Sequence, residues 1–281
     1  AALATIPVFL AALLAVRDAA YSGSLAGVPE FAAARSSLAG LQGLTTPVFL
    51  MQGRRDFAFG LGQALQAYRA LAGPKRLWLG LHGHAPSTFP AADSDAMLAE
   101  GKRWFDRWLA GAANGIDLSK PVALAPESWS GQPVRLDAPP RPVGRMIRLG
   151  GNATITQAGK VQRSSAALRS PLEVFGAPRV SVTVDPTSTW TRLVAVLSAR
   201  TPSGREIVIG GGGVPLVTKK KRVTIQLTSQ ATFVPAGSTM TLTLGSSSLA
   251  QNAGNLLYLD LPFGPGARIS VGQATLRIPA L

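Results

Sequence analysis

The sequence predicts an α/β domain followed by an all-β domain, and three observations support this order. Two short apolar runs alternate with two helical segments before residue 110. After residue 142, short alternating segments are separated by Gly, Pro and Ser. The charge also changes, because residues 1–130 carry 11 Lys and Arg against 9 Asp and Glu, whereas residues 131–281 carry 17 against 5. We therefore expect two domains, 1–130 and 131–281.

The first forty residues are rich in Ala and Leu at helical spacing. Residues 1–16 are apolar and uncharged, but they have no basic leader and are too few to span a bilayer. We expect a buried or lid-like helix here and no membrane span. The chain is expected to begin inside a domain.

The α/β pattern lies in the next seventy residues. Residues 48–51 form an unbroken apolar run, which is typical of a parallel strand covered on both faces. Residues 61–71 predict an amphipathic helix, 76–81 a second strand and 93–109 a second helix. Trp104 and Trp108 lie at helical spacing and are expected in the core between helix and sheet. This order predicts a parallel sheet with right-handed crossovers.

The second half predicts an antiparallel β-sandwich or jelly roll. Residues 121–142 hold six prolines, and we interpret them as an edge strand followed by a crossing linker. The run Gly210-Gly211-Gly212-Gly213 lacks the Lys-Ser/Thr of a phosphate loop and is expected to be a flexible connection. Seven strands are predicted from alternation, at 180–184, 193–197, 206–209, 223–227, 240–244, 256–259 and 274–278.

Composition excludes several kinds of site. The chain has no Cys, so it holds neither a disulfide nor a thiolate ligand or nucleophile. Two His residues are too few for a His-rich metal site, and we expect no metal and no cofactor. The basic run Lys219-Lys220-Lys221-Arg222 has no nucleic-acid-binding motif around it, so a solvated hairpin tip is favoured over a nucleic-acid partner. The lack of Cys is compatible with cytoplasm or export.

Two polar residues follow the two predicted parallel strands. Asp56 and His84 each lie just beyond a strand, 28 residues apart. Taken singly, Asp56 suits a helix N-cap or an ion pair with Arg54 or Arg55, and His84 suits a structural histidine. Together they match the acid and base of a nucleophilic triad, because neighbouring strand ends meet at one edge of a sheet. His82 competes with His84 for the role of base.

Aromatic residues follow the candidate acid. Phe57 and Phe59 are candidates for the wall of an apolar acyl pocket, although packing under the following helix explains them equally well. His82 is a further candidate to line such a pocket. The expected substrate class is a small-molecule ester or a peptide.

Seven segments follow one another in a characteristic order and spacing: residues 46–56, 80–84 (Gly-Leu-His-Gly-His), 104–111 (Trp-Phe-Asp-Arg-Trp-Leu-Ala-Gly), 121–129, 148–151, 170–184 and 223–244. In this order they resemble the cocaine esterase/X-Pro dipeptidyl-peptidase family of α/β-hydrolases. The resemblance covers residues 40–281, the latter part of the hydrolase domain and a C-terminal jelly roll, and implies that Asp56 and His84 are the acid and base of a Ser-His-Asp triad. It also implies hydrolysis of esters or of X-Pro dipeptidyl peptides.

The sequence departs from that family in its nucleophile. No Gly-x-Ser-x-Gly occurs, since residues 23–27 place Ser one position early and residues 245–249 lack the closing Gly. We therefore expect a missing N-terminal hydrolase half as partner, with no triad-dependent hydrolysis by these residues alone. The alternative is a non-catalytic module whose basic sandwich binds carbohydrate or an anionic surface.

Overall fold

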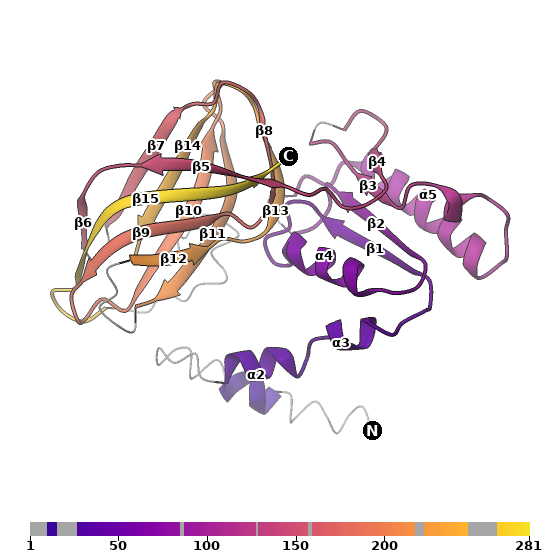
Figure 1. Ribbon diagram of the computed structural model, residues 1–281, viewed down its shortest axis with the longest axis horizontal. Helices are drawn as coiled ribbons and strands as arrows, with labels where there is room; N and C mark the ends of the chain where they lie inside the picture. Colours follow the sequence, from indigo (N-terminus) through magenta and orange to yellow (C-terminus); the bar gives the residue numbers. More distant parts are fainter. Residues whose placement is uncertain are drawn as a thin grey trace.

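The computed structural model describes residues 10–15, 27–84, 87–127, 129–156, 159–216, 222–246 and 263–281. They form an α/β part and a β-sandwich that lie beside each other, with the C-terminus between the two (Figure 1). Among these residues no helix has both the length and the apolar character needed to cross a bilayer.

The α/β part is built on a four-stranded sheet of order β1-β2-β3-β4. The strands β1 (Val48–Gly53), β2 (Lys75–Gly80) and β3 (Val122–Leu124) are parallel, and β4 (Val134–Leu136) is antiparallel to β3. The predicted parallel strands at 48–51 and 76–81 correspond to β1 and β2. Because β4 belongs to this sheet, the sheet continues past residue 130, and the chain crosses to the sandwich between residues 136 and 143.

Two helices cover opposite faces of this sheet. The helix α4 (Leu61–Ala70) packs on the face that carries Leu77 and Leu79, and α5 (Ala91–Trp108) packs on the face that carries Trp78. This division follows from the alternation of side chains along β2. The short 3-10 helix η1 (Ile116–Leu118) precedes β3.

The apolar residues of α5 do not all face the sheet. Trp104 is buried beside Phe49, with ring centroids 6.3 Å apart, and Trp108 lies 5.6 Å from Trp104. Phe105 and Leu109, in contrast, are 55% and 81% exposed. The prediction of a core position therefore fits Trp104 and Trp108 better than it would fit Phe105 and Leu109.

The N-terminal segment is helical but not buried within the described residues. Residues 10–15 form a helical turn in which Leu10 is 49% exposed. Two short helices follow, α2 (Val28–Ala33) and α3 (Leu38–Leu41), and both lie below α4 in Figure 1. The expectation of a buried helix is thus wrong for residues 10–15, and the rest of 1–16 lies outside the described part of the chain.

The sandwich consists of two antiparallel sheets. One sheet has the order β11-β10-β14-β7, and the other has the order β12-β9-β15-β8-β13, with β5 and β6 also paired to β15. The predicted strand at 256–259 and the basic residues Lys219 to Lys221 lie outside the described residues. The strands are β5 (Val143–Leu149), β6 (Ala153–Thr156), β7 (Lys160–Ala167), β8 (Leu172–Gly176), β9 (Arg179–Pro186), β10 (Arg192–Arg200), β11 (Glu206–Pro215), β12 (Arg222–Gln226), β13 (Gln230–Val234), β14 (Thr239–Gly245) and β15 (Arg268–Ala280).

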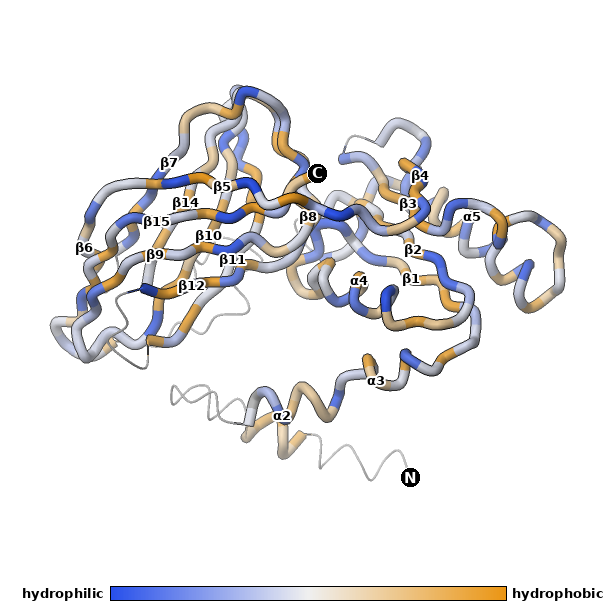
Figure 2. Tube along the Cα trace, in the orientation of Figure 1, coloured by the Kyte–Doolittle hydropathy of each residue, from blue (hydrophilic) through white to orange (hydrophobic). Residues whose placement is uncertain are grey.

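A single apolar core lies between the two sheets of the sandwich. Leu197 and Leu242 enter it from one sheet, and Val182 and Leu276 enter it from the other. Figure 2 shows the period-two alternation of hydrophobic and hydrophilic residues along several of these strands. The alternation is the physical basis of the strand predictions, since strands such as β9 and β12 bury one face and expose the other.

The glycine run is not a flexible connection, and this prediction is corrected by the structure. Gly210 to Gly213 lie within β11 and pair in register with β10. A Cβ atom on Gly212 would lie 2.2 Å from the carbonyl oxygen of Gln226, and one on Gly210 would lie 3.0 Å from Thr228 Oγ1. The run is therefore explained by the close approach of a second backbone rather than by flexibility.

The two parts are joined at the turn that follows β1. The Arg54 guanidinium is buried, donates to the carbonyl oxygens of Ala231 and Ala125, and forms an ion pair with Glu173 of β8. Burial raises the pKa of Glu173, although the charge of Arg54 opposes this effect. Two backbone bonds reinforce the junction, from Ala231 N to the Arg54 carbonyl at 2.7 Å and from Leu61 N to the Ser229 carbonyl at 2.9 Å.

Candidate active site

Asp56 lies in the turn between β1 and α4, and its side chain accepts hydrogen bonds from the backbone of the same turn. Its Oδ1 accepts hydrogen bonds from the backbone N–H groups of Ala58 and Phe59, both at 2.9 Å. On the sandwich side, Gln230 Nε2 donates to the Asp56 carbonyl oxygen at 3.3 Å. The two N–H donors fix the orientation of the Asp56 carboxylate, as in an Asx turn.

His84 lies in the turn after β2, and it contacts the same carboxylate twice. The His84 backbone N–H donates to Asp56 Oδ2 at 3.1 Å, and His84 Nδ1 lies 3.0 Å from the same oxygen. Gly83 has φ of 123° and a Cβ there would lie 2.7 Å from Asp56 Oδ2, so only glycine allows this approach. The structure therefore brings together the two residues that the sequence pairs.

The strand ends are themselves in close contact. A Cβ atom on Gly53 at the end of β1 would lie 2.0 Å from the carbonyl oxygen of His82. The absence of this side chain lets the turns after β1 and β2 approach each other. The parallel register of β1 and β2, in which Gly53 lies opposite Gly80, then sets the separation of Asp56 and His84.

The carboxylate is ionised and the imidazole is accessible. Burial alone would raise the pKa of Asp56, but hydrogen bonds from the Phe59 N–H, from the His84 ring and N–H, and from the Ala58 N–H together lower it below its usual range. An ionised acceptor fixes Nδ1 of His84 as the protonated nitrogen. The His84 side chain is 59% exposed, and no described residue forms a hydrogen bond with its Nε2. This nitrogen is free to accept a proton.

The three predicted pocket residues lie in different environments. Phe59 is 57% exposed and its ring lies 5.4 Å from the ring of His84. Phe57 is only 4% exposed, so its side chain belongs to the interior and does not line an open pocket. His82 is half-buried with Nδ1 unbonded, and its ring lies 6.2 Å from that of Phe89. Burial lowers the pKa of His82.

Two buried charged residues support this site and were missed by the sequence interpretation. Asp93 has no exposed surface, and it accepts hydrogen bonds from Leu81 N at 2.6 Å and from Trp78 Nε1 at 3.2 Å. It thus ties the first turn of α5 to the end of β2. Arg54 fixes the turn after β1 in a similar way. The local signal for Arg54 is a charged residue next to an apolar strand, and that for Asp93 is an acidic residue in the first turn of a helix, and exposed residues show both patterns.

Among the described residues, no group of three or more His, Cys, Asp or Glu side chains is close enough together to hold a metal ion. The chemistry available here is proton transfer by His84, supported by the negative charge of Asp56.

Comparison with known proteins identifies the fold. No protein-family model and no curated protein matches the chain, but solved structures do. A CocE/NonD family hydrolase from Staphylococcus aureus aligns with a TM-score of 0.63 and 14% identity, covering 86% of this chain and 55% of the hydrolase. The described chain has the fold of part of a CocE/NonD family hydrolase. This confirms the family resemblance in the sequence at the level of the fold.

Two further enzymes align over a similar length. An α-amino acid ester hydrolase has a TM-score of 0.62 and 14% identity, covering 84% of this chain and 55% of the enzyme. An aminopeptidase from the marine sediment archaeon Thaumarchaeota archaeon has a TM-score of 0.61 and 12% identity, covering 85% and 55%. The chain therefore spans little more than half the length of each of these proteins.

Proposed function

We propose that this chain is part of a serine hydrolase and supplies the acid and the base of its Ser-His-Asp triad. The observation that carries the proposal is the Asp56–His84 pair at the ends of adjacent parallel strands, 3.0 Å apart, with Nε2 of His84 free among the described residues. In this role Asp56 holds the Nδ1–H tautomer and stabilises the imidazolium. His84 Nε2 takes the proton of the nucleophile and later returns it to the leaving group.

The nucleophile is proposed to come from a segment outside these 281 residues. No Gly-x-Ser-x-Gly occurs in the sequence, and β1 is paired on only one side within the described sheet. A further parallel strand along the free edge of β1 would bring its carboxyl end to the same edge as Asp56 and His84. The missing hydrolase half is thus the proposed partner, and by themselves these residues are expected to be inactive.

The substrate class follows from the same resemblance. We propose hydrolysis of an ester or of an X-Pro dipeptidyl peptide, with the exposed ring of Phe59 beside His84 as an apolar contact for the acyl group. The sandwich, in the jelly-roll arrangement of the family, would lie against the turn after β1 and shape the entrance. The contact of Gln230 with the Asp56 carbonyl supports this placement.

The test uses the longest chain that the gene encodes, with p-nitrophenyl butyrate and Ala-Pro-p-nitroanilide as substrates. We expect Asp56→Asn and His84→Ala each to lower kcat by at least about 10³-fold, because both act in the proton transfer. His82→Gln is the matched control and should keep most of the activity. Near-normal turnover in either triad variant would show that the assignment is wrong.

A second measurement tests the location of the nucleophile. A fluorophosphonate probe reacts covalently with activated serine, so the 281-residue chain alone should remain unlabelled. Labelling of this chain that disappears in His84→Ala would mean that it carries its own nucleophile. That result would overturn the proposed partner while keeping the triad.

A further inference from the structure

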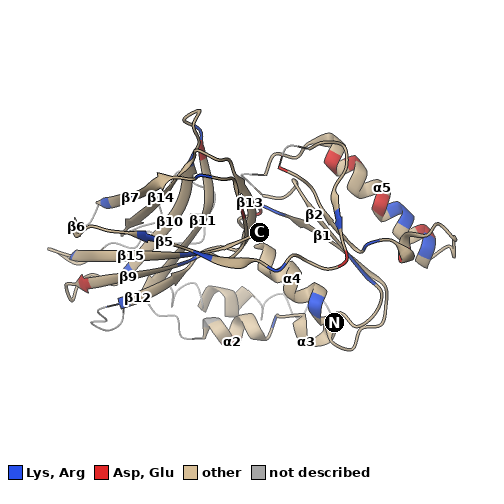
Figure 3. Ribbon diagram, turned by 45° about the horizontal axis from the view of Figure 1, so that its top comes forward, with Lys and Arg blue, Asp and Glu red and all other residues tan. Residues whose placement is uncertain are grey.

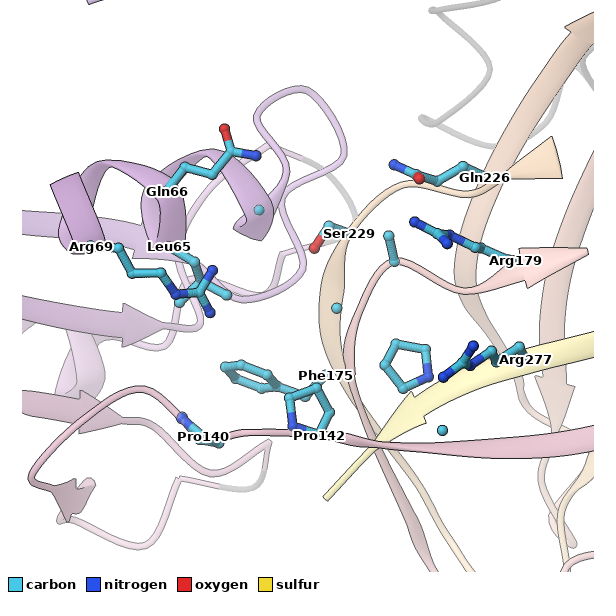
Figure 4. A pocket seen from close by; sticks show the side chains of 15 residues that line it. Leu65, Gln66, Arg69, Pro140, Pro142, Phe175, Arg179, Gln226, Ser229 and Arg277 are labelled. Atoms are coloured by element: carbon cyan, nitrogen blue, oxygen red, sulfur yellow. The ribbon is translucent and has the colours of Figure 1, made fainter. Parts of the chain in front are cut away.

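A cleft lies between α4 and the outward face of the seven-stranded sheet, away from the candidate active site. It encloses about 490 Å³ and is lined by three arginines, Arg69 of α4, Arg179 of β9 and Arg277 of β15. Figure 4 shows Arg69 extending from one wall, with Arg179 and Arg277 on the opposite wall. Neither Asp56 nor His84 lines this cleft.

The positive charges in this cleft are not neutralised by the protein. Arg179 and Arg277 lie directly opposite each other in the β9–β15 register, and like charges in such a pair repel. Within the described part of the chain, none of the three arginines forms an ion pair, and no Asp or Glu lines the cleft. Figure 3 shows a related imbalance along the ribbon of the sandwich, with Lys and Arg positions on β5 and β12 and few Asp or Glu positions among them.

Other arginines in this molecule have a different environment. Arg54 and Arg76 are buried, and each is paired with a glutamate. A third buried arginine, Arg163, donates to the backbone carbonyl oxygens of Gly151 and Val271, so each buried arginine has partners within the protein. The cleft arginines are exposed, converge from two parts of the molecule and lack such partners, which is the pattern of an anion-binding site.

The rest of the lining suits an organic ligand. The side-chain amides of Gln66 and Gln226 add hydrogen-bond donors at the rim, and Gln226 lies opposite Arg179 in the β12–β9 register. The apolar part of the lining consists of Pro140, Pro142 and Pro279, since the side chain of Phe175 is only 1% exposed and belongs to the interior. Charged donors beside an apolar lining match a molecule with anionic groups on an aromatic or aliphatic body.

We propose that this cleft binds a small organic anion with two negative charges, either a phosphate monoester or a dicarboxylate. The guanidinium groups bind its anionic oxygens in pairs, and the prolines of the lining contact its apolar body. Because its walls come from α4 and from the sandwich, the ligand bridges the two parts. The proposal is independent of the hydrolase function.

The first experiment measures binding to the full 281-residue chain by titration calorimetry. The probes are phenyl phosphate, phthalate and the neutral analogue benzyl alcohol. We expect at least one of the two anions to bind, more weakly as salt is added, and benzyl alcohol not to bind. Binding of phenyl phosphate alone would identify a phosphate monoester, and binding of phthalate alone would identify a dicarboxylate. Absence of binding by both anions, or equal binding of benzyl alcohol, would overturn the proposal.

The second experiment locates the site with the double variant Arg179→Gln/Arg277→Gln. Removing both charges should weaken anion binding by at least about tenfold, because charge-assisted hydrogen bonds are lost. It should not lower the Tm of the ligand-free chain, since a repulsive pair is removed. The matched control is Arg268→Gln, also exposed on β15 but nine residues from Arg277, which is roughly 30 Å along a strand. Equal weakening by the control and the double variant would exclude this cleft as the site.

Discussion

The two parts of this molecule are stabilised in different ways. The sandwich has one large apolar core to which both sheets contribute, and its buried arginine, Arg163, donates to backbone carbonyl oxygens of Gly151 and Val271. The α/β part has two smaller cores, one on each face of its sheet. Its elements are also joined by buried ion pairs, chiefly Glu100 with Arg76 and Arg135. The comparison indicates that the sandwich is stabilised mainly by burial of apolar area, while the α/β part depends more on specific polar contacts.

The sheet edges show the same contrast. In the α/β part β1 is apolar but mostly half-buried, with Met51 41% exposed, and its outer edge has no partner among the described strands. An apolar parallel strand with a free edge is a site for pairing with another chain segment. The part that lacks a large core is therefore also the part with a free strand edge among the described residues, and it is the part that carries Asp56 and His84.

The largest expected effect comes from breaking the buried charge cluster of the α/β part. Glu100→Gln leaves Arg76 with an unbalanced buried charge, so the free energy of unfolding of this part should fall by about 3–5 kcal/mol. Hydrogen exchange of the β2 and α5 amides measures this loss, and the sandwich amides report whether it stays local. An equal loss of protection in β10 would mean that the two parts unfold together and that the contrast is wrong.

The control for this variant is on the same helix. Asp106 pairs with Lys102 at 2.6 Å, but both side chains are exposed. Asp106→Asn should therefore change stability by less than about 1 kcal/mol. A loss as large as that of Glu100→Gln would show that α5 responds to any change of charge.

The next effect tests the close backbone approach in the sandwich. Gly212→Ala should destabilise the sandwich by roughly 1–3 kcal/mol, since its Cβ would meet the Gln226 carbonyl oxygen and force β11 and β12 apart. The adjacent Gly211→Ala is the matched control, because a Cβ there has its nearest neighbour at 3.8 Å. Thermal unfolding separates the two variants. Equal Tm values would indicate that β11 and β12 adapt without cost.

The smallest expected effect is the contribution of Asp56, in the turn after β1, to the free energy of unfolding. Its pKa in the folded state lies below the unfolded value of about 3.9, so between these values the unfolded chain binds more protons and stability rises with pH. The stabilisation is complete above the unfolded pKa and is lost as the pH falls through the folded pKa. Asp56→Asn should therefore lower the free energy of unfolding by about 1 kcal/mol at pH 7, and this loss should become smaller as the pH falls below about 3.9.

Denaturant titrations at several pH values measure this difference. Asp137→Asn is the control, because Asp137 is 83% exposed and pairs with Lys120 only at 3.5 Å. It should show little dependence on pH. A difference between wild type and Asp56→Asn that stays constant down to pH 2 would mean that the Asp56 charge does not stabilise the fold.

The elements with a strong repeating pattern could be predicted from sequence. The apolar runs of β1 and β2 and the alternation along β9 and β14 are local signals, and they correspond to strands near the expected positions. The helix α5 was placed correctly, but which of its apolar residues are buried was not, because Phe105 and Leu109 depend on what covers the helix. Strands β6, β7 and β13 were missed because their residues pair with distant segments and show little pattern of their own.

The candidate site also contains both residues that could be predicted from the sequence and residues that could not. Asp56 and His84 could be named because each follows a strand whose apolar run is visible in the chain. The roles of Arg54 and Asp93 could not, since a buried charged residue is recognised only by the distant groups that bind it. The glycine run of β11 was misinterpreted for this reason as well, because its cause is the carbonyl oxygen of Gln226.

The sequence by itself determined the order of an α/β part and a β-rich part, the positions of the first two strands, and the pairing of Asp56 with His84. These features depend on side-chain periodicity and chain direction, which are local properties. Only the tertiary structure decided the hydrogen-bond distance between Asp56 and His84, the buried position of Phe57, and the convergence of Arg69, Arg179 and Arg277. Each of these joins residues far apart in the chain, and such contacts arise only when the elements are packed together.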